Sequence, residues 1–595
     1  MELGCGDEQW LAALGSAESA LVLVRAAIAA SAGRPLEPLR PGGGQHAFAD
    51  LWQPAAATAT RSLASLVREI SGGGAPLQLL PDLETTLLAR LCALGQHALA
   101  EMFRAARGLG AVLLAQVRPE HGDGQSPPRD VYQTFIERHR QDGLSALLGA
   151  YPVLARLIPH EVMRWSESSL ETIRRIDGDR TQLQSIFGVP PRAALVSLRP
   201  GLGDPHRGGR TTTRVVFEDR GWRWQLVYKP RSLALEAEFQ SAITQAHSTE
   251  LPPLRSAHSL DRGSYGYVEW VARKPCRSVD EIAHFYRNAG RLSALLYVMG
   301  CTDCHERNLI AHSDQLVVID AETLFEPPPS VDVRKGASLE PATSSTGSVY
   351  DDSIARCGIL PSWRYAGSGR RPFDTSALGP PDGRPVVEAC AGWANANTDW
   401  MCWRVDEHST EPADSSPIDS GQHNPFFQHV GIFCDGFADQ CALLVEQRHH
   451  WLRPGGLLDR FVGLPRRMVL RPTYVYATIQ AQMLQPEALR SELARRSTLD
   501  QLARLYLIAP ERPRDWPILA EEQRQMSALD IPYFSHMVET TGLPLDGAEQ
   551  IERYFAVNGL DECRRRLRSL NEATIQSQLR IIRAAAAAAL SGGRS

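Results

Sequence analysis

The sequence lacks the features that mark membrane, secreted and nucleic-acid-coating proteins. The apolar run near residues 20–30 is interrupted by Arg25 and the N-terminus opens with acidic residues, so neither a membrane span nor a signal peptide is expected. The net charge is only -5, with no basic or acidic tail to attract a charged partner. The 11 cysteines are scattered and odd in number, unlike a secreted disulfide framework. We expect a cytoplasmic protein that binds no nucleic acid.

Apolar spacing divides the 595 residues into regions of different character, and the mixture predicts an α+β protein. Residues 1–190 show helical periodicity with few β-branched alternations. Residues 191–490 form the mixed central part of the chain, and residues 491–595 are expected to be a second helical region. Residues 327–425 are rich in Pro, Ser, Gly and Asp, which predicts long loops, and helical signals return from about residue 427.

Short segments rich in Val, Thr and aromatic residues follow Ala193 and predict strands. Residues 211–217 and 222–229 are expected to pair as a hairpin joined by residues 218–221. Further predicted elements are a strand at 265–271, a helix at 279–299 and a short apolar strand at 315–319 that ends at Asp320.

The segment 301–325 carries the most informative spacing. Asp303 precedes Asn308 by five residues, and Asp320 follows at the end of the apolar strand. In kinase-like phosphoryl transfer, one loop supplies a carboxylate near the attacking hydroxyl and an amide ligand for the metal, and a carboxylate after the next strand holds magnesium. Asn308, Asp320 and Glu322 offer the oxygen ligands that magnesium prefers. The alternative is a polar loop capped by local hydrogen bonds.

Lys229 closes the predicted strand LVYKPR, where a lysine is either a solvated edge residue or a phosphate ligand. A strand-borne lysine upstream of the Asp and Asn loop matches the order in which kinases place the lysine that binds ATP phosphates. An acidic residue, Glu236 or Glu238, is expected to fix its position, and we assign Glu238 with Lys229 to the nucleotide site. The sequence therefore predicts ATP and Mg²⁺ as cofactors.

A competing signal lies in the same loop, where Cys301 and Cys304 form a CxxC pattern beside His305. Such a pattern is typical of zinc or redox sites. No second CxxC or histidine pair stands at finger spacing, so we favour the phosphoryl-transfer interpretation.

Upstream, the segment GLGDPHRGGR places Asp204 and His206 in a glycine-rich loop. Its glycines permit close approach of the backbone to a phosphate, although the spacing matches neither a Walker A motif nor GxGxxG. One interpretation is a turn with a surface histidine. The other is a histidine near neutral pKa, oriented by a carboxylate for acid and base chemistry.

Beyond these single residues, the chain resembles the dehydratase domain of LanM-type class II lanthipeptide synthetases at many separate points, in the family's order. The matching stretches are YPVLARL (151–157), GDPHRGGR (203–210), LVYKPRS (226–232), YGYVEWV (265–271), TDCHERNLIA (302–311), VVIDAETLF (317–325), GFADQ (436–440), RRMVLRPTYVY (466–476) and LDIPYF (529–534).

The resemblance implies a lipid-kinase-like, two-lobed catalytic core with extensive added helices. It also implies phosphorylation of Ser and Thr in a leader-bearing precursor peptide, followed by elimination of phosphate to dehydroalanine or dehydrobutyrine. The phosphorylation set is Lys229, Asp303, His305, Asn308, Asp320 and Glu322. The elimination set is Asp204, His206, Arg467 and Thr473, of which the last two would be unremarkable by themselves.

Three departures from the family are visible in the sequence. Arg307 stands in TDCHERN where the family has an acid, and DAET replaces DLET. The family's C-terminal zinc-binding cyclase domain has no counterpart, so ring closure is not expected. Either a separate cyclase acts later, the dehydrated residues serve another purpose, or the sequence is truncated.

Three functions are compatible with these motifs. A stand-alone peptide dehydratase needs both residue sets, whereas a peptide Ser/Thr kinase needs only the first. A silent peptide-binding scaffold would be expected to have lost Lys229, Asp303, Asn308 or Asp320, and the sequence keeps all four. We therefore favour the dehydratase.

Overall fold

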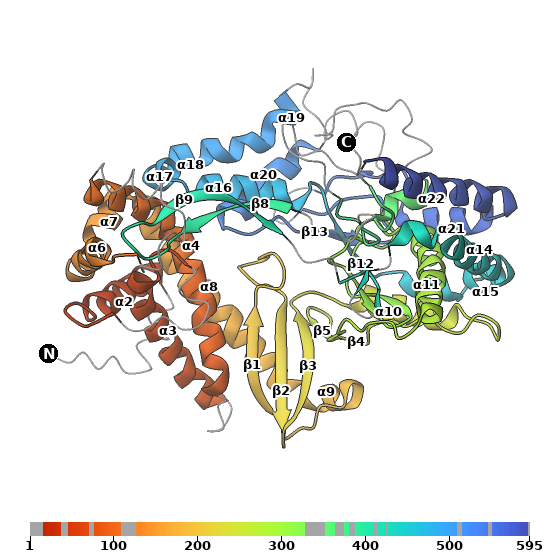
Figure 1. The fold of residues 1–595 in the computed structure, drawn as a ribbon, viewed down its shortest axis with the longest axis horizontal. Coiled ribbons are helices and arrows are strands. Elements are labelled where there is room, and N and C mark those ends of the chain that lie inside the picture. Colours follow the sequence, from red (N-terminus) through yellow and green to blue (C-terminus); the bar gives the residue numbers. More distant parts are fainter. Residues whose placement is uncertain are drawn as a thin grey trace.

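Two helical bodies flank a central antiparallel sheet (Figure 1). The computed structural model describes residues 16–36, 46–70, 77–108, 127–327, 352–362, 374–379, 387–409, 414–419, 422–423, 425–507, 515–545 and 550–592. Helices and several small antiparallel sheets make up this part of the chain, so the predicted α+β class is confirmed.

The N-terminal body is helical, as the apolar periodicity predicted. In its longest helix, α4, the side chains of Leu83, Leu87, Leu91, Leu94 and Ala98 are buried at intervals of three or four residues, which places them on one face. The helices of this body are α2 (Ala17–Ala29), α3 (Ala49–Ile70), α4 (Leu80–Arg107), α6 (Asp130–Gln141), α7 (Ser145–Ala150), α8 (Pro152–Gly178) and α9 (Arg180–Phe187).

The central sheet has the order β1-β2-β3-β5-β4, and all its neighbours are antiparallel. The predicted hairpin is confirmed, with a turn of two residues, Arg220 and Gly221, that both have positive φ. Its strands are β1 (Ala194–Pro200), β2 (Thr213–Asp219), β3 (Trp222–Lys229), β4 (Ser259–Asp261) and β5 (Gly266–Glu269). Lys229 therefore ends a central strand.

The second body surrounds the loop that carries Asp303. Helix α11 (Val279–Val298) leads into this loop, and the hairpin of β6 (Leu309–His312) and β7 (Gln315–Val318) leads out of it, as predicted for α11 and β7. Helix α10 (Ala234–Gln245), which was not predicted, packs against β4 of the central sheet. The remaining helices of this body are α14 (Val430–Glu446), α15 (Arg448–Leu452), α21 (Gly559–Ser569) and α22 (Glu572–Gly592).

Between α15 and α21 the chain returns to the N-terminal body, where α17 packs against α4 and α8. The helices here are α16 (Thr473–Met483), α17 (Pro486–Arg490), α18 (Glu492–Leu499), α19 (Arg504–Leu507) and α20 (Trp516–Ser527). Two strands in this region were not predicted: β12 (Pro465–Met468) pairs with β13 (Phe534–Met537). This pairing brings Arg467 opposite Ser535.

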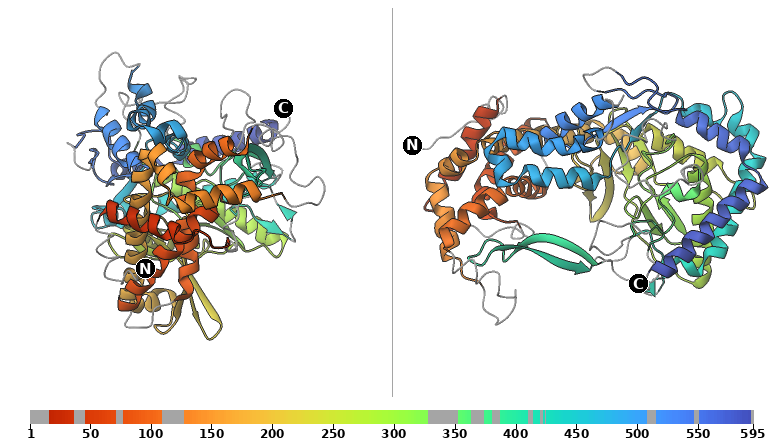
Figure 2. Two further views of the ribbon diagram at one scale, coloured as in Figure 1. Left: turned by 90° about the vertical axis from the view of Figure 1, so that its left-hand side faces the viewer. Right: turned by 90° about the horizontal axis from the view of Figure 1, so that it is seen from above.

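The prediction that residues 327–425 form only loops is wrong in the part that the structure describes. A ribbon of β8 (Val387–Ala394) and β9 (Cys402–Ser409) reaches from the N-terminal helices toward the second body (Figure 2). The rings of Trp393 and Trp403 lie 5.0 Å apart across the ribbon, and Trp393 donates to Gln96 of α4. This cross-strand packing supports strands that alternate too weakly to be recognised in the sequence.

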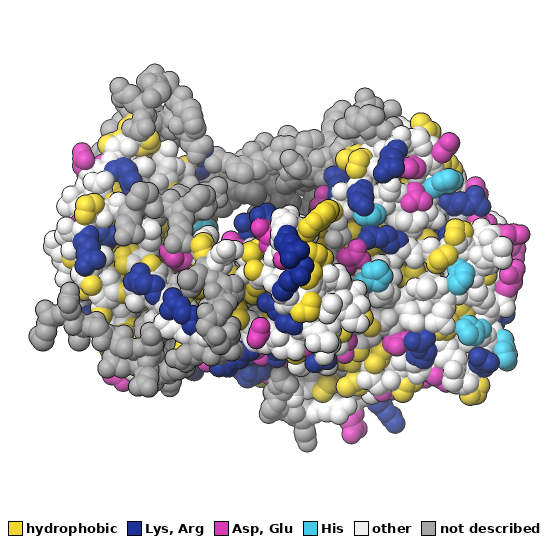
Figure 3. Space-filling model, turned by 90° about the horizontal axis from the view of Figure 1, so that it is seen from below, with side chains coloured by type: hydrophobic (Ala, Val, Ile, Leu, Met, Phe, Trp, Pro, Cys, Tyr) yellow, Lys and Arg dark blue, Asp and Glu magenta, His cyan; other side chains and the backbone are white. Residues whose placement is uncertain are grey.

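The face seen from below is hollowed between the two bodies, and Lys and Arg side chains lie beside the hollow (Figure 3). Among the helices that the structure describes, none combines the length and apolar character needed to cross a bilayer.

Two glycines let α11 and α14 approach to backbone contact. A Cβ atom on Gly290 of α11 would lie 2.1 Å from the carbonyl oxygen of Phe433, and one on Gly436 of α14 would lie 2.0 Å from that of Arg287. Neither neighbour is a side chain that can rotate away. This contact fixes the helix that leads into the Asp303 loop.

We expect Gly436→Ala to lower the free energy of unfolding by about 1–3 kcal/mol or more, because the added methyl forces the two helices apart. Gly431, in the same helix, has open space around its Cβ position. Gly431→Ala should therefore leave stability unchanged or raise it by up to about 1 kcal/mol. Urea unfolding of both variants tests this, and equal effects would contradict the packing argument.

Candidate active site

The loop between α11 and β6 brings together three of the predicted residues. Asn308 Nδ2 donates to the carbonyl oxygen of Asp303 (2.8 Å) and lies 3.3 Å from its Oδ2. His305 Nε2 lies 3.6 Å from Asp303 Oδ1. Because the amide nitrogen of Asn308 holds the loop, its Oδ1 is the atom left for a metal.

Asp303 stands among acidic neighbours. Burial, followed by the negative charges of Asp320 and Glu322, raises the pKa of Asp303 to about 7, while Arg467 and the Asn308 hydrogen bond act in the opposite direction. A carboxylate with a pKa near neutrality is suited to accept a proton from a hydroxyl group.

Asp320 follows β7 and meets the lysine at the end of β3. Lys229 Nζ lies 2.9 Å from Asp320 Oδ2 and donates to the carbonyl oxygen of Ile319 at 3.0 Å. Burial alone would raise the pKa of Asp320, but Lys229 and Arg231 hold it below its ordinary value. The structure thus joins two residues that lie far apart in the sequence.

Of the two acids considered for Lys229, the structure selects Glu236. Its Oε1 lies 4.0 Å from Lys229 Nζ, whereas Glu238 pairs with Arg460 at 2.7 Å. Residues two apart on a helix point about 200° away from each other, so α10 can present only one of the two to the lysine. The assignment of Glu238 beside Lys229 is therefore corrected.

Arg231 is a central residue that sequence reasoning missed. Its Nη2 lies 2.6 Å from Glu236 Oε1 and 2.7 Å from Asp320 Oδ1, and its Nε lies 2.8 Å from Glu322 Oε2. The available signal was its place in LVYKPRS, two residues beyond Lys229, because alternate residues of an extended segment point to the same side.

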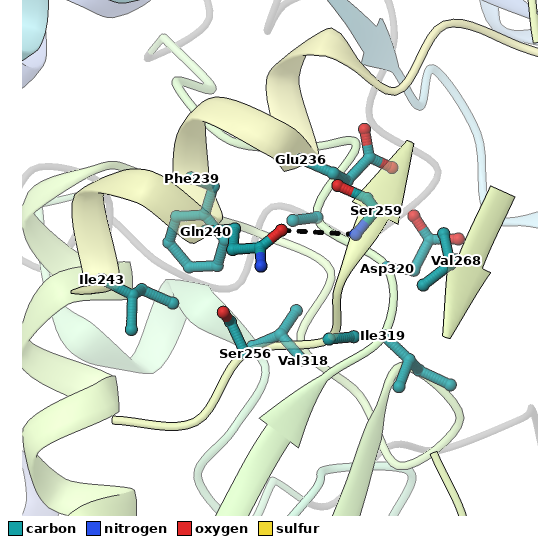
Figure 4. A pocket seen from close by; sticks show the side chains of 12 residues that line it. Glu236, Phe239, Gln240, Ile243, Ser256, Ser259, Val268, Val318, Ile319 and Asp320 are labelled. Carbon is teal, nitrogen blue, oxygen red and sulfur yellow. Dashed lines mark hydrogen bonds between the residues drawn. The ribbon is translucent and has the colours of Figure 1, made fainter. Parts of the chain in front are cut away.

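A small pocket lies beside this cluster, between α10 and the end of β7 (Figure 4). Glu236 and Asp320 line it from two sides, and Gln240 accepts a hydrogen bond from the Ser259 amide at 3.3 Å. Its apolar lining residues are Phe239, Ile243, Ala257, Val268, Val318, Ile319 and Ala321. This lining lowers the local polarity around the two carboxylates.

The glycine-rich loop is held in place by a carboxylate that lies far away in the sequence. Asp530, which is only 5% exposed, accepts hydrogen bonds from the amides of Gly208 (2.7 Å) and Gly209 (2.8 Å). Gly208 and Gly209 have φ of +88° and +76°, which orients both amides toward it. These amides therefore hold the loop rather than a phosphate.

The anchored loop gives His206 a defined tautomer. His206 Nδ1 lies 2.7 Å from the carbonyl oxygen of Ile531 and must donate to it, which leaves the lone pair on Nε2. Burial and the positive charge of Arg467 lower the pKa of His206, and Glu322 and Asp204 oppose this. The imidazole is therefore neutral near pH 7, with a basic nitrogen.

Arg467 connects this histidine to the carboxylate cluster. Its guanidinium contacts Glu322 and lies 5.3 Å from the centre of the Tyr533 ring, which in turn lies 5.3 Å from the His206 ring. Tyr533 was not singled out from the sequence. Arg467 Nε is buried and makes no hydrogen bond within the described part of the chain.

The two remaining candidates, Asp204 and Thr473, make no hydrogen bond to the other site residues within the described part of the chain. Asp204 acts on His206 through its charge, and its side chain has no hydrogen-bond partner among the described residues. Thr473 is the first residue of α16, a position whose backbone N–H has no partner within the helix. Among the described residues, no hydrogen bond joins Thr473 to Arg467 or His206.

The side-chain oxygens of the three proposed ligands suit magnesium, but two arginines and a lysine form ion pairs with the carboxylates among them. Asn308, Asp320 and Glu322 supply only oxygen ligands. Within the described ranges, no three His, Cys, Asp or Glu side chains are spaced to hold a metal ion. Oxygens of Asp320 and Glu322 are instead bound by Lys229, Arg231 and Arg467.

The cysteine pair is buried and reduced. Cys304 Sγ lies 3.2 Å from Cys301 Sγ, and both residues are at most 1% exposed. Cys304 Sγ therefore has its hydrogen-bond partner in Cys301.

Comparison with known proteins shows the family of the chain. A family described as "Domain of unknown function (DUF4135)" matches residues 151–537, which is more than half of the chain. The chain is also 30% identical over 245 residues to the "Lacticin 481/lactococcin biosynthesis protein LcnDR2" of Lactococcus lactis subsp. lactis. That match covers 39% of this chain and about a quarter (26%) of the relative. The chain belongs to the DUF4135 family and contains a LanM-type dehydratase region.

Proposed function

We propose that the chain dehydrates Ser and Thr in a ribosomal precursor peptide by phosphorylation and subsequent elimination of phosphate. The biosynthesis protein that it resembles is named for lacticin 481 and lactococcin, which supports a precursor of the lanthipeptide type as the substrate. A lipid-kinase-like arrangement of the core agrees with the lysine of β3 facing the carboxylate after β7.

One observation carries this proposal: both residue sets meet at Glu322. Arg231, which contacts Asp320 of the phosphorylation set, binds one oxygen of Glu322, and Arg467 of the elimination set binds the other. A kinase that only phosphorylates would have no need of Arg467 in contact with Glu322, or of a neutral His206 close enough to feel the charges of both.

In the first half-reaction, Asp303 accepts the proton of the Ser or Thr hydroxyl as the hydroxyl oxygen bonds to the γ-phosphorus of ATP. The bond from that phosphorus to its bridging oxygen breaks, and ADP leaves. Lys229 would neutralise phosphate oxygens, and Asn308, Asp320 and Glu322 would hold the metal. Magnesium, when bound, neutralises the charge that develops on the phosphates. The raised pKa of Asp303 suits it to this role.

In the second half-reaction, His206 Nε2 takes the α-proton of the phosphorylated residue. The electron pair of the C–H bond forms the double bond, and the Cβ–O bond breaks to release phosphate. Arg467 has a buried Nε–H without a partner among the described residues, and it offers this donor to the departing phosphate. Thr473 adds a hydroxyl donor for the phosphate. It is the first residue of α16, and the N-terminus of a helix favours anions.

Incubation with a lanthipeptide precursor, ATP and Mg²⁺ should lower the peptide mass by one water per modified residue, and EDTA should abolish the change. Mass spectrometry checks this. A lasting gain of one HPO₃ per residue would support the kinase alone. An unchanged mass, together with no effect of ATP on the melting temperature, would support a peptide-binding scaffold.

We expect His206→Asn to separate the two half-reactions. Asn keeps a donor for the Ile531 carbonyl but provides no base, so elimination should slow by about 10²–10⁴-fold while phosphopeptide accumulates. His247→Asn is the matched control, because His247 also bonds a backbone carbonyl through Nδ1 (Thr244, 2.6 Å) but is exposed. Equal rates of elimination in H206N and wild type would exclude His206 as the base.

Asp303→Asn should abolish phosphorylation and yet stabilise the metal-free protein at alkaline pH. The folded pKa of about 7 exceeds the ordinary value of 3.8, so ionisation of this carboxyl costs stability progressively as pH rises from about 4 to about 7. Asn carries no such cost. Melting temperatures in EDTA should therefore diverge in favour of D303N between about pH 4 and about pH 7 and stay apart above that, and parallel curves would refute the assignment.

A further inference from the structure

Arg231 binds both of the carboxylates that are proposed to hold magnesium. Its guanidinium contacts three carboxylates from two parts of the chain: Glu236 of α10, and Asp320 and Glu322 in the segment after β7. The side chain is 12% exposed, so the contacts form away from bulk solvent. Asp320 and Glu322 are also the carboxylates proposed to hold magnesium.

In the metal-free protein, the charge of Arg231 is needed to balance the negative charges of the buried carboxylates. Three carboxylates, Glu236, Asp320 and Glu322, face three cationic side chains, Lys229, Arg231 and Arg467. Without Arg231, the cluster would hold an excess of negative charge in a largely buried site, which is unfavourable. A divalent cation cannot bind Asp320 and Glu322 together while the guanidinium stands between them, because like charges repel at such distances.

Glu236 offers Arg231 a second resting position. It is 9% exposed, and its Oε2 is buried and accepts no hydrogen bond within the described residues. Figure 4 shows Glu236 on α10 at the same pocket as Asp320. A guanidinium that leaves Asp320 and Glu322 can therefore pair with both oxygens of Glu236, the bidentate geometry that arginine favours.

We propose that Arg231 is a resident counter-cation that holds Asp320 and Glu322 in the metal-free protein and moves onto Glu236 when a metal ion enters. The proposal rests on the proposed function for the identity of the metal ligands. Metal binding and the Arg231 contacts then compete, so the protein without nucleotide binds divalent ions weakly. The phosphates of ATP restore affinity by adding ligands and negative charge.

The experiment measures binding of Mn²⁺, an oxygen-preferring probe, to the full chain without nucleotide. Arg231→Gln removes the competing charge and should tighten Mn²⁺ binding by about 5–150-fold, the usual range of coupling between two ligands. Arg460→Gln is the matched control, since it breaks an arginine pair with Glu238 on the same helix outside the site. Its Mn²⁺ affinity should equal that of wild type.

Glu236→Gln is the second variant and should act in the opposite direction. Without the charge of Glu236, Arg231 has no alternative partner and remains on Asp320 and Glu322, so Mn²⁺ binding should weaken severalfold. This variant decides the question if Arg231→Gln does not fold, which its melting temperature reveals. An arginine with a purely structural role would not give opposite shifts.

Unchanged or weaker Mn²⁺ binding by folded R231Q, or unchanged or tighter binding by E236Q, overturns the proposal, as does a lack of measurable binding in every variant. The assay requires no turnover. A shift in Mn²⁺ affinity without peptide dehydration would refute only the proposed function. Dehydration without the shift would refute only the role of Arg231.

Discussion

The site depends on mutual neutralisation of buried charges. Lys229, Arg231 and Arg467 come from β3, the segment after it and β12, while Glu236, Asp320 and Glu322 come from α10 and the chain after β7. Burial of any one of these groups alone would be unfavourable, because the free energy of desolvating a charge is offset only by attraction to an opposite charge nearby. The charges therefore tie the central sheet, α10, the segment after β7 and the β12–β13 pair to one another.

Elements with a clear local pattern could be predicted from the sequence, and elements that depend on partners distant in the sequence could not. The hairpin of β2 and β3 and the helix α11 have clear apolar spacing and a strong turn. Strand β12 has four residues, too few for a period, and its partner β13 lies more than sixty residues away. The β8–β9 ribbon depends on contacts between Trp393, Trp403 and α4, which no local pattern reveals.

The candidate site divides in the same way. Motif spacing brought out Lys229, Asp303, Asn308 and Asp320, because kinase-like chemistry fixes their order along the chain. The choice between Glu236 and Glu238 required the phase of α10, and α10 itself was missed. Arg231 and Tyr533 matter through partners distant in sequence. Two of the matching stretches, GDPHRGGR and LDIPYF, prove to be one structural unit, since Asp530 anchors the loop of His206.

The same cluster produces two carboxylates with opposite properties. Asp320 contacts Lys229 and Arg231, which hold its pKa low and keep it ionised as a ligand. Asp303 has the amide of Asn308 for a partner, and burial, followed by the negative charges of Asp320 and Glu322, raises its pKa to about 7. Where two neighbouring acids have pKa values that their environments shift in opposite directions, one typically acts as a base and the other stays ionised as a ligand. Any cation that leaves Asp320 must therefore be replaced by another, since burial alone would raise the pKa of Asp320 and favour its neutral form.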